Sequence, residues 1–248
     1  MITGMIDCHC HILPQIDDGA SNIEVSLEMA KIASADGIRK IIATPHISDN
    51  FYSPADIKNR VNRLNRYLAE NQVPVLIYPA AEVSIALDIS LFSQYTMNHT
   101  AYILIEFPHD YLPPFAPKLL AWILARGLTP IIAHPERNFD VIQNPDSFID
   151  LLHTGIYTQI TGGSLTGDFG TAAQHCAAFL LDAGVVDIIA SDAHSSRIRP
   201  PVLSKAVEVA SARIGQKAAL KLVRDNPTAV LTGKKCCRNR QTPSPSLS

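Results

Sequence analysis

Two histidines separated by one residue lie near the start of the chain, in the apolar run Ile6-Asp7-Cys8-His9-Cys10-His11-Ile12-Leu13. If this run is a β-strand, His9 and His11 project to one face, because side chains two residues apart on a strand point the same way. Neutral imidazole is the commonest metal ligand in proteins, and Asp17 and Asp18 follow with carboxylate oxygens. The spacing indicates one side of a metal site, although an ordinary polar pair at a strand end has the same pattern.

Ligand-type residues recur where the other apolar segments end. Predicted strands over 40–46, 73–83, 102–105, 130–133 and 186–190 each run into His, Asp or Glu. The candidate ligands are His9, His11, Asp18, His46, Glu82, Glu106, His134, Asp192 and His194. One divalent ion takes about four to six donors, so nine donors indicate two or three ions with bridging carboxylates. Mixed imidazole and carboxylate donors favour manganese, iron, zinc or cobalt and disfavour magnesium.

Strands and helices that could position these ligands alternate along the chain. One further strand is expected over 156–160, followed by a loop over 161–167. Helices are expected after an N-cap at Ser21 or Asn22, from Pro54 to about Asn71, and over 117–126, 170–183, 201–213 and 216–224, with Asn226-Pro227 closing the last. About seven β-α units of this kind predict an α/β barrel, a parallel sheet covered by helices. Functional residues of such barrels lie at the carboxyl ends of the strands.

The composition is that of an ordinary globular protein, with 248 residues, 47% of them hydrophobic and 18% charged. A net charge of -2 gives no reason to expect nucleic-acid binding. The sequence shows neither a signal peptide nor an apolar segment long enough to span a membrane. Five cysteines without framework spacing indicate free thiols in a reducing compartment, so we expect a cytoplasmic protein. Cys8 and Cys10 alternate with the histidines and are expected to face a covering helix.

The domain organisation expected from the sequence is simple. Residues 1–233 form one catalytic domain, and 234–248 form a tail that is first basic, then rich in proline and serine, and disordered. Within the domain, the apolar stretch 111–115 fits plain loop packing, a rim of the site or an assembly surface.

The chemistry that these residues suit best is hydrolysis of a phosphate ester. Clustered metals lower the pKa of bound water to about 7 and can hold both the attacking and the leaving oxygen of a phosphoryl displacement. Arg137 and Arg199 follow ligands closely, and the planar guanidinium matches phosphate oxygens bidentately. The alternative for both is a surface position or a salt bridge to Glu136. His46 is a candidate general acid for the leaving group.

Cysteine-based tyrosine-phosphatase chemistry is excluded by the sequence. It requires a low-pKa thiolate followed by an arginine in a tight phosphate-binding loop. None of the five cysteines is followed six residues later by arginine. If the protein is a tyrosine phosphatase, it is therefore expected to use metals.

Several motifs together resemble the PHP (polymerase and histidinol phosphatase) superfamily. They are His9-x-His11, Asp17-Asp18-Gly19, Thr44-Pro45-His46, His134-Pro135-Glu136-Arg137, Gly163-Ser164-Leu165-Thr166-Gly167 and Ser191-Asp192-Ala193-His194. More narrowly, the chain from about Met5 to Gly233 is similar to bacterial protein-tyrosine phosphatases encoded with capsule and exopolysaccharide genes. A cysteine between the first two histidines and a basic tail depart from that pattern.

The resemblance implies a distorted (β/α)7 TIM-like barrel that holds three metals, usually manganese. It implies dephosphorylation of phosphotyrosine on a partner protein, a bacterial tyrosine autokinase that controls capsule or exopolysaccharide synthesis. All nine candidate ligands match the family's metal ligands, and Arg137 and Arg199 match its phosphate-binding arginines. Two alternatives stay open: a PHP phosphoesterase acting on a small molecule such as histidinol phosphate, and a non-catalytic metal-binding regulatory module.

Overall fold

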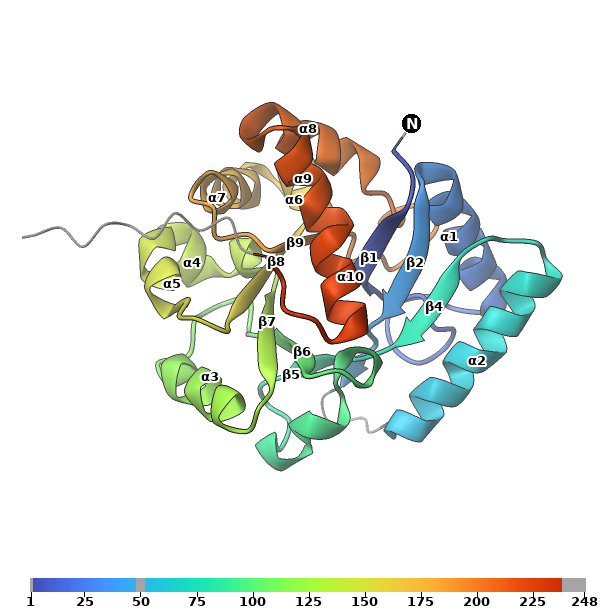
Figure 1. The fold of residues 1–248 in the computed structure, drawn as a ribbon, viewed down its shortest axis with the longest axis horizontal. Coiled ribbons are helices and arrows are strands. Elements are labelled where there is room, and N and C mark those ends of the chain that lie inside the picture. Colours follow the sequence, from blue (N-terminus) through green and yellow to red (C-terminus); the bar gives the residue numbers. More distant parts are fainter. Residues whose placement is uncertain (1, 48–51, 238–248) are drawn as a thin grey trace, which may run out of the picture.

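The strands of the chain form a distorted barrel of parallel strands, which a computed structural model describes for residues 2–47 and 52–237 (Figure 1). One sheet has the order β1 (Met5–Cys10), β2 (Ile38–Ala43), β4 (Leu76–Pro79). The other has the order β3 (His46–Ile47), β5 (Glu82–Ser84), β6 (Tyr102–Glu106), β7 (Thr129–Ala133), β8 (Tyr157–Thr161), β9 (Ile188–Ala190). Every pairing within both sheets is parallel.

The nine strands in the described part of the chain occupy seven positions in the barrel, because two positions each hold a strand that is broken into two parts. Only Thr44 and Pro45 separate β2 from β3, and only Ala80 and Ala81 separate β4 from β5. The part of each broken strand nearer its carboxyl end, β3 or β5, pairs in the second sheet instead of the first. This change of sheet distorts the barrel. A bridge between Cys10 and Ala193 connects the end of β1 to the segment after β9. The expectation of seven β-α units in a distorted barrel is confirmed.

Helices cover the outside of this barrel. Their bounds are α1 (Ile23–Asp36), α2 (Pro54–Glu70), α3 (Ala116–Ala125), α4 (Phe139–Gln143), α5 (Pro145–Leu151), α6 (Gly162–Thr166), α7 (Thr171–Asp182), α8 (Ser204–Ile214), α9 (Gln216–Val223) and α10 (Asp225–Thr232). Asn22 caps α1 by accepting a hydrogen bond from the Val25 amide, and Ser53 forms a capping box with Asp56 at α2. None of the helices in the described ranges is long and apolar enough to cross a membrane.

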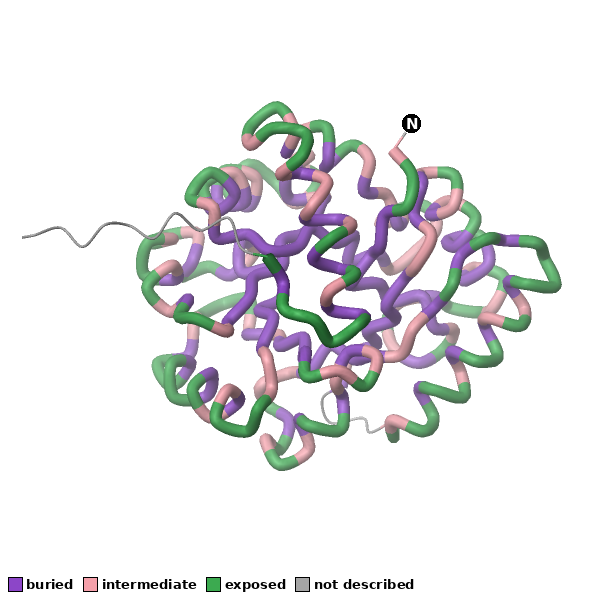
Figure 2. The backbone as a smooth tube through the Cα atoms, in the orientation of Figure 1, coloured by how far each residue is buried: buried purple, intermediate pink, exposed green. Residues whose placement is uncertain are grey.

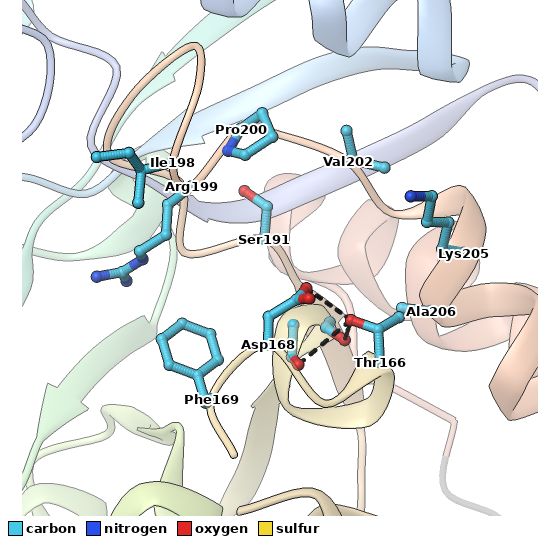
Figure 3. Close-up of a pocket in the computed structure, with 12 residues that line it drawn as sticks. Thr166, Asp168, Phe169, Ser191, Ile198, Arg199, Pro200, Val202, Lys205 and Ala206 are labelled. Carbon is cyan, nitrogen blue, oxygen red and sulfur yellow. Dashed lines mark hydrogen bonds between the residues drawn. The ribbon is translucent and has the colours of Figure 1, made fainter.

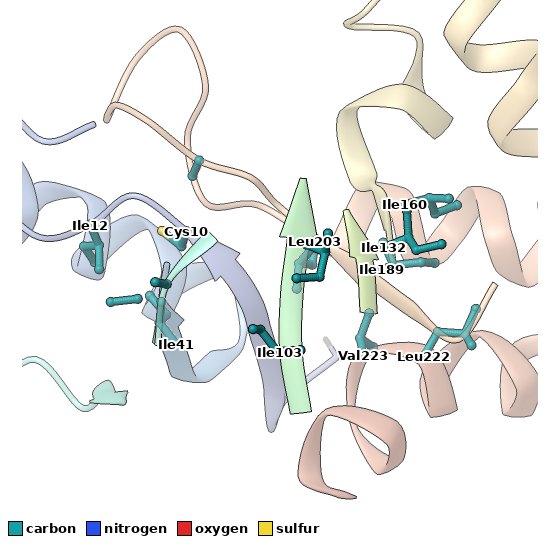
Figure 4. Packing of buried hydrophobic residues seen from close by; sticks show 14 of the residues in the cluster. Cys10, Ile12, Ile41, Ile103, Ile132, Ile160, Ile189, Leu203, Leu222 and Val223 are labelled. Carbon is teal, nitrogen blue, oxygen red and sulfur yellow. The ribbon is translucent and has the colours of Figure 1, made fainter. Parts of the chain in front are cut away.

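Two apolar layers hold the barrel together. The outer layer packs strand residues such as Ile103, Ile132 and Ile189 against the helices (Figure 4). The inner layer fills the barrel with residues from alternate strand positions, including Leu104, and with Val230 of α10. Figure 1 shows α10 lying across one end of the barrel, and Figure 2 shows buried strands surrounded by helices with exposed outer sides. Most strand residues are therefore buried on both faces, as in other parallel barrels, while Leu76 at the start of the edge strand β4 is exposed.

A break in the regular pairing of β1 changes where its cysteines point. The register with β2 shifts between Asp7 and Cys10. Cys8 consequently lies in the inner layer, while Cys10 packs in the outer layer. The expectation of a helix-facing position is confirmed for Cys10 and wrong for Cys8, because simple alternation along a strand does not survive a bulge.

Other corrections concern short helices. Asn226-Pro227 lies inside α10 instead of closing a helix, which is tolerated because a proline in the first helical turn interrupts no internal hydrogen bond. The segment 161–167, expected to be a loop, contains α6. The helices α4 and α5 were not expected at all, and each is capped by an asparagine side chain, Asn138 and Asn144.

The expected tail boundary at 233 is too early. The Cys236 side chain is buried, and its backbone amide donates a hydrogen bond to the Tyr102 hydroxyl, which itself donates to the Lys234 carbonyl. Residues 234–237 thus pack against the end of the barrel beside the inner layer. The rest of the expected tail, 238–248, lies outside the described residues.

The free edge of the first sheet is covered by one side chain from α2. β4 is an edge strand of its sheet, so the backbone groups of Ile77 on that side lack a strand partner. Asn65 accepts from the Ile77 amide at 2.8 Å and donates to the Ile77 carbonyl at 2.9 Å. Its carboxamide therefore replaces the missing strand and fixes α2 on the sheet.

We predict that Asn65→Ala lowers the free energy of unfolding by about 1–3 kcal/mol, because it leaves two partly buried backbone groups unpaired. Asn62→Ala, an exposed position on the same helix, is the matched control and should change stability by less than about 0.5 kcal/mol. Denaturant unfolding of both variants measures the difference. Equal stability of the two variants would contradict the proposed clamp.

Candidate metal centre

The structure brings all nine candidate ligands together at the carboxyl ends of the strands. They fall into four overlapping groups in which the potential ligand atoms lie within 4.8 Å of one another. The groups are His11, Asp18, His46 and His194; His9, His134 and Asp192; His9, His11 and Glu82; and His46, Glu82 and Glu106. Because His9, His11, His46 and Glu82 each belong to two groups, the arrangement is one continuous cluster.

The deepest part of the cluster is built around His9. Its Nε2 lies 3.2 Å from each of three atoms: His11 Nε2, Glu82 Oε2 and Asp192 Oδ1. Glu82 Oε2 is buried and forms no hydrogen bond within the described chain, although ring nitrogens of His9, His11 and His46 lie 3.1–3.3 Å away. Ligand atoms around a shared ion are typically about 3 Å apart, since metal–nitrogen and metal–oxygen bonds measure roughly 2.0–2.2 Å. The donor set fits divalent metal ions.

Neighbouring side chains fix the orientation of both deep histidines. His9 Nδ1 lies 2.9 Å from Gln159 Oε1, and His11 Nδ1 lies 2.7 Å from Asp17 Oδ2. Both partners accept hydrogen bonds, so Nδ1 of each ring carries the proton and donates it. With metal bound, the Nε2 of each ring would be unprotonated and would point into the cluster, which is the usual arrangement behind metal-binding histidines.

The outer part of the cluster is open to solvent. Asp18 Oδ1 lies 3.5 Å from His46 Nε2 and 3.4 Å from His194 Nε2, and the Asp18 side chain is 68% exposed. The other ring nitrogen of His46, Nδ1, lies 3.1 Å from Glu82 Oε2 and 3.7 Å from Glu106 Oε2. A substrate would therefore reach the cluster from the side of Asp18 and His46.

The pKa values of several clustered side chains depend on the charges of their neighbours. Burial alone would raise the pKa of Glu82 and of Asp192, but the adjacent histidines, His9 foremost, hold both pKa values well below their ordinary range. Burial raises the pKa of Glu106 to about 7, and the Glu82 charge adds to this rise. Burial lowers the pKa of His134 to about 4, which keeps its ring neutral. Ionised carboxylates and a neutral imidazole are the protonation states that bind metals.

Backbone conformation contributes to the convergence. His134 and Asp192 have positive φ angles of 29° and 51°, which are uncommon outside glycine and turn each residue out of the preceding strand direction. Gly19 is needed for a different reason: a Cβ there would lie 2.1 Å from the His11 carbonyl oxygen. The Asp17-Asp18-Gly19 turn can pack against His11 only because Gly19 has no side chain.

Two arginines approach the cluster through the same carboxylate. Arg137 Nη1 and Arg199 Nη2 each lie 2.5 Å from Asp192 Oδ2. Both guanidinium groups also lie over the ring of Phe169, at 4.5 and 5.2 Å from its centroid, and Figure 3 shows Arg199 beside that ring. Glu136 is not their partner, since it is buried and accepts hydrogen bonds from the Thr161 amide and the Ser164 hydroxyl.

Sequence reasoning missed two residues of the site, Gln159 and Phe169, and the role of a third, Asp17. Gln159 carried a signal, because it is a polar residue in an otherwise buried strand, β8, which had no expected ligand. Asp17 was expected, with Asp18, as a source of carboxylate oxygens, whereas the structure gives it an orienting contact with His11. Phe169 carried no sequence signal, since contact with two arginines distant in sequence is visible only in the fold.

Two curated relatives cover most of the chain. The tyrosine-protein phosphatase YwqE of Bacillus subtilis is 40% identical over 201 residues, which are 79% of this chain and 79% of that protein. The tyrosine-protein phosphatase CpsB of Streptococcus pneumoniae is 30% identical over 239 residues, 92% of this chain and 98% of the relative.

A solved structure and a family model complete the comparison. A crystal structure described with YwqE and CpsB as metal-dependent tyrosine phosphatases superimposes with a TM-score of 0.90 at 37% identity, covering 94% of this chain and 97% of the other. The family model for capsular polysaccharide synthesis, CpsB/CapC, matches residues 5–232. The chain belongs to the CpsB/CapC family of capsular polysaccharide synthesis proteins.

Proposed function

We infer that this protein is a metal-dependent tyrosine-protein phosphatase. The observation that carries this inference is the position of two arginines on Asp192, a carboxylate whose other oxygen faces the histidines of the cluster. Arginine matches phosphate oxygens, and a multi-metal site suits phosphate-ester hydrolysis. Tyrosine as the substrate side chain is supported by the relatives, which are tyrosine phosphatases over most of this chain's length.

We assign the nine clustered side chains as the metal ligands, in agreement with the donor chemistry and the overlapping groups. Two or three divalent ions, manganese first among the candidates, would supply Lewis acidity and an acidified water when bound. Both ring nitrogens of His46 face carboxylates of the cluster, Glu82 and Asp18, which favours a ligand role for His46 over a general-acid role. Gln159 and Asp17 orient the deep rings.

Arg137 and Arg199 are assigned to bind the phosphate group. Asp192 Oδ2 and the Phe169 ring hold the two guanidinium groups near each other, and each still has N–H groups that can donate to phosphate oxygens. Two fixed positive charges at this point would also stabilise the negative charge on the phosphoryl oxygens in the transition state.

The partner that we propose is a phosphotyrosine protein, in particular a bacterial tyrosine autokinase that controls capsule or exopolysaccharide synthesis. Membership of a capsular polysaccharide synthesis family supports this choice. We also propose a cytoplasmic location, because all five cysteines are free thiols, as is usual in a reducing compartment.

The first prediction concerns the metals. Protein stripped with a chelator should lose hydrolysis of a phosphotyrosine peptide and regain it with manganese, while thiol alkylation should have no effect because the cysteines have no catalytic role. Phosphate release from the peptide and from histidinol phosphate, measured side by side, provides the test. Preference for histidinol phosphate would replace the protein substrate with a small molecule, and chelator-resistant hydrolysis would contradict the metal mechanism.

The second prediction concerns the residue behind His11. Asp17→Ala should weaken metal binding about 10- to 100-fold, because the ring loses the acceptor that fixes its tautomer. Metal titration calorimetry of the stripped protein measures this change. Asp150→Ala, an exposed acidic residue on α5, is the control that should bind metal normally. Unchanged affinity in the Asp17 variant would exclude the proposed orienting role.

The third prediction concerns the phosphate-binding fork. Arg199→Lys keeps the charge but loses the planar donor pair, so kcat/KM for a phosphotyrosine peptide should fall about 10- to 100-fold. Arg213→Lys is the matched control, because Arg213 forms a similar two-bond contact with Asp182 on the surface of α8. Steady-state kinetics of the manganese-loaded variants distinguishes them, and equal activity of both would show that Arg199 does not bind phosphate.

A further inference from the structure

Large exposed apolar side chains are concentrated on the face of the barrel that carries the metal cluster. The described residues include six such side chains: Leu76, Tyr111, Phe115, Phe139, Phe179 and Ile198. Four of these six lie in connections that follow the carboxyl ends of β6, β7 and β9: Tyr111, Phe115, Phe139 and Ile198. Single exposed apolar residues are ordinary, but a set gathered around one site indicates an interaction surface.

Ile198 is the most exposed of the set, at 90%, and it directly precedes Arg199 in the chain. The loop that carries it is closed by hydrogen bonds from the His194 and Ser195 amides to the Arg199 carbonyl. The Ser195 hydroxyl accepts from the Ile198 and Arg199 amides, so the loop is fixed with Ile198 outside. Because the loop already fixes the backbone around the exposed Ile198 side chain, binding to it would cost little conformational entropy.

A pocket beside Ile198 extends the surface away from the metals. It has a volume of about 140 Å³, and Phe169, Arg199, Val202 and Lys205 also line it (Figure 3). Because Arg199 is shared between this pocket and the metal cluster, a phosphate bound at Arg199 would place its carrier chain next to Ile198.

Phe139 has a matching relation to the other arginine, since it lies two residues after Arg137 and is 57% exposed. Its amide donates to the His109 carbonyl at 2.7 Å. The preceding residue, Asn138, donates to the Tyr111 carbonyl at 2.8 Å. These bonds tie the loop after β6 to the start of α4 and keep Tyr111 and Phe139 on the rim. Each phosphate-binding arginine therefore has an exposed apolar neighbour.

We propose that Ile198, with Phe139 and Tyr111, forms a docking surface for apolar side chains that flank the phosphotyrosine in a protein substrate. This inference rests on the proposed function. The occupant is the polypeptide that carries the phosphotyrosine, because the apolar side chains adjoin both arginines and residues that flank a phosphotyrosine bound there would contact them. Burial of apolar area would then add to affinity beyond the phosphate contacts.

The experiment compares three substrates of the manganese-loaded protein: p-nitrophenyl phosphate, a phosphotyrosine peptide with flanking leucines, and the same peptide with flanking serines. Ile198→Ser and Phe139→Ser should each raise KM for the leucine peptide about 5- to 10-fold. The same variants should change kcat/KM for the serine peptide and for p-nitrophenyl phosphate by less than 2-fold. Phe179→Ser, an exposed apolar residue on α7 away from the cluster, is the control and should alter none of the three.

Two results would overturn the docking surface while leaving the phosphatase intact: equal KM values for the leucine and serine peptides in the unaltered protein, or an equal loss on all three substrates in both variants. Failure of the unaltered, metal-loaded protein to hydrolyse any of the three substrates would instead overturn the proposed function, and the docking surface with it.

Discussion

The Asp192 carboxylate connects the two chemical parts of the site. Its Oδ1 lies 3.2 Å from His9 Nε2 and 3.4 Å from His11 Nε2, while its Oδ2 lies 2.5 Å from both Arg137 and Arg199. One buried side chain thus sets the distance between the clustered donors and the two arginines that we propose to bind phosphate. The backbone supports this position: the Asp192 amide donates to the His9 carbonyl, and the neighbouring Ser191 is held by Asp7.

The break in two strands is what makes room for so many polar side chains inside a barrel. After Pro45 and after Ala81 the chain enters the second sheet, so that His46 on β3 and Glu82 on β5 stand side by side in register. Lower in the barrel, apolar residues such as Ile6 and Ile42 fill the interior. The fold separates an apolar lower part, which stabilises the barrel, from an upper part in which buried charged side chains lie close enough to stabilise one another.

Much of this could be predicted from sequence because the signals are local. Strands that end in a ligand-type residue, such as 130–133 before His134, place their last side chain at the common edge of a parallel barrel whatever the details of packing. Asn22 and Pro54 mark helix starts by capping chemistry that involves only near neighbours. All nine candidate ligands consequently lie in one cluster, although their role as ligands remains a prediction.

The errors come from interactions that are not local. Cys8 turned inward because the pairing of β1 with β2 is irregular, and a bulge depends on the partner strand. Pro227 lies within α10, whose Val230 and Leu231 pack in the inner layer of the barrel, a contact with strands that are distant in sequence. Phe169 was missed because its ring contacts Arg137 and Arg199, which lie 32 and 30 residues away in sequence.

The contact of β1 with the segment after β9 and with α10 has a consequence for how the protein folds. β1, formed by residues 5–10, pairs with β2 but also meets the segment after β9 and the helix α10, more than 180 residues later. Contacts so distant in sequence carry a large loop-closure cost, and folds that depend on them form slowly. During synthesis the first strand must wait, with one edge unpaired, until the segment after β9 and α10 have left the ribosome. Closure of the barrel is therefore a late event in folding, and the metal cluster, which needs both β1 and the segment after β9, can assemble only then.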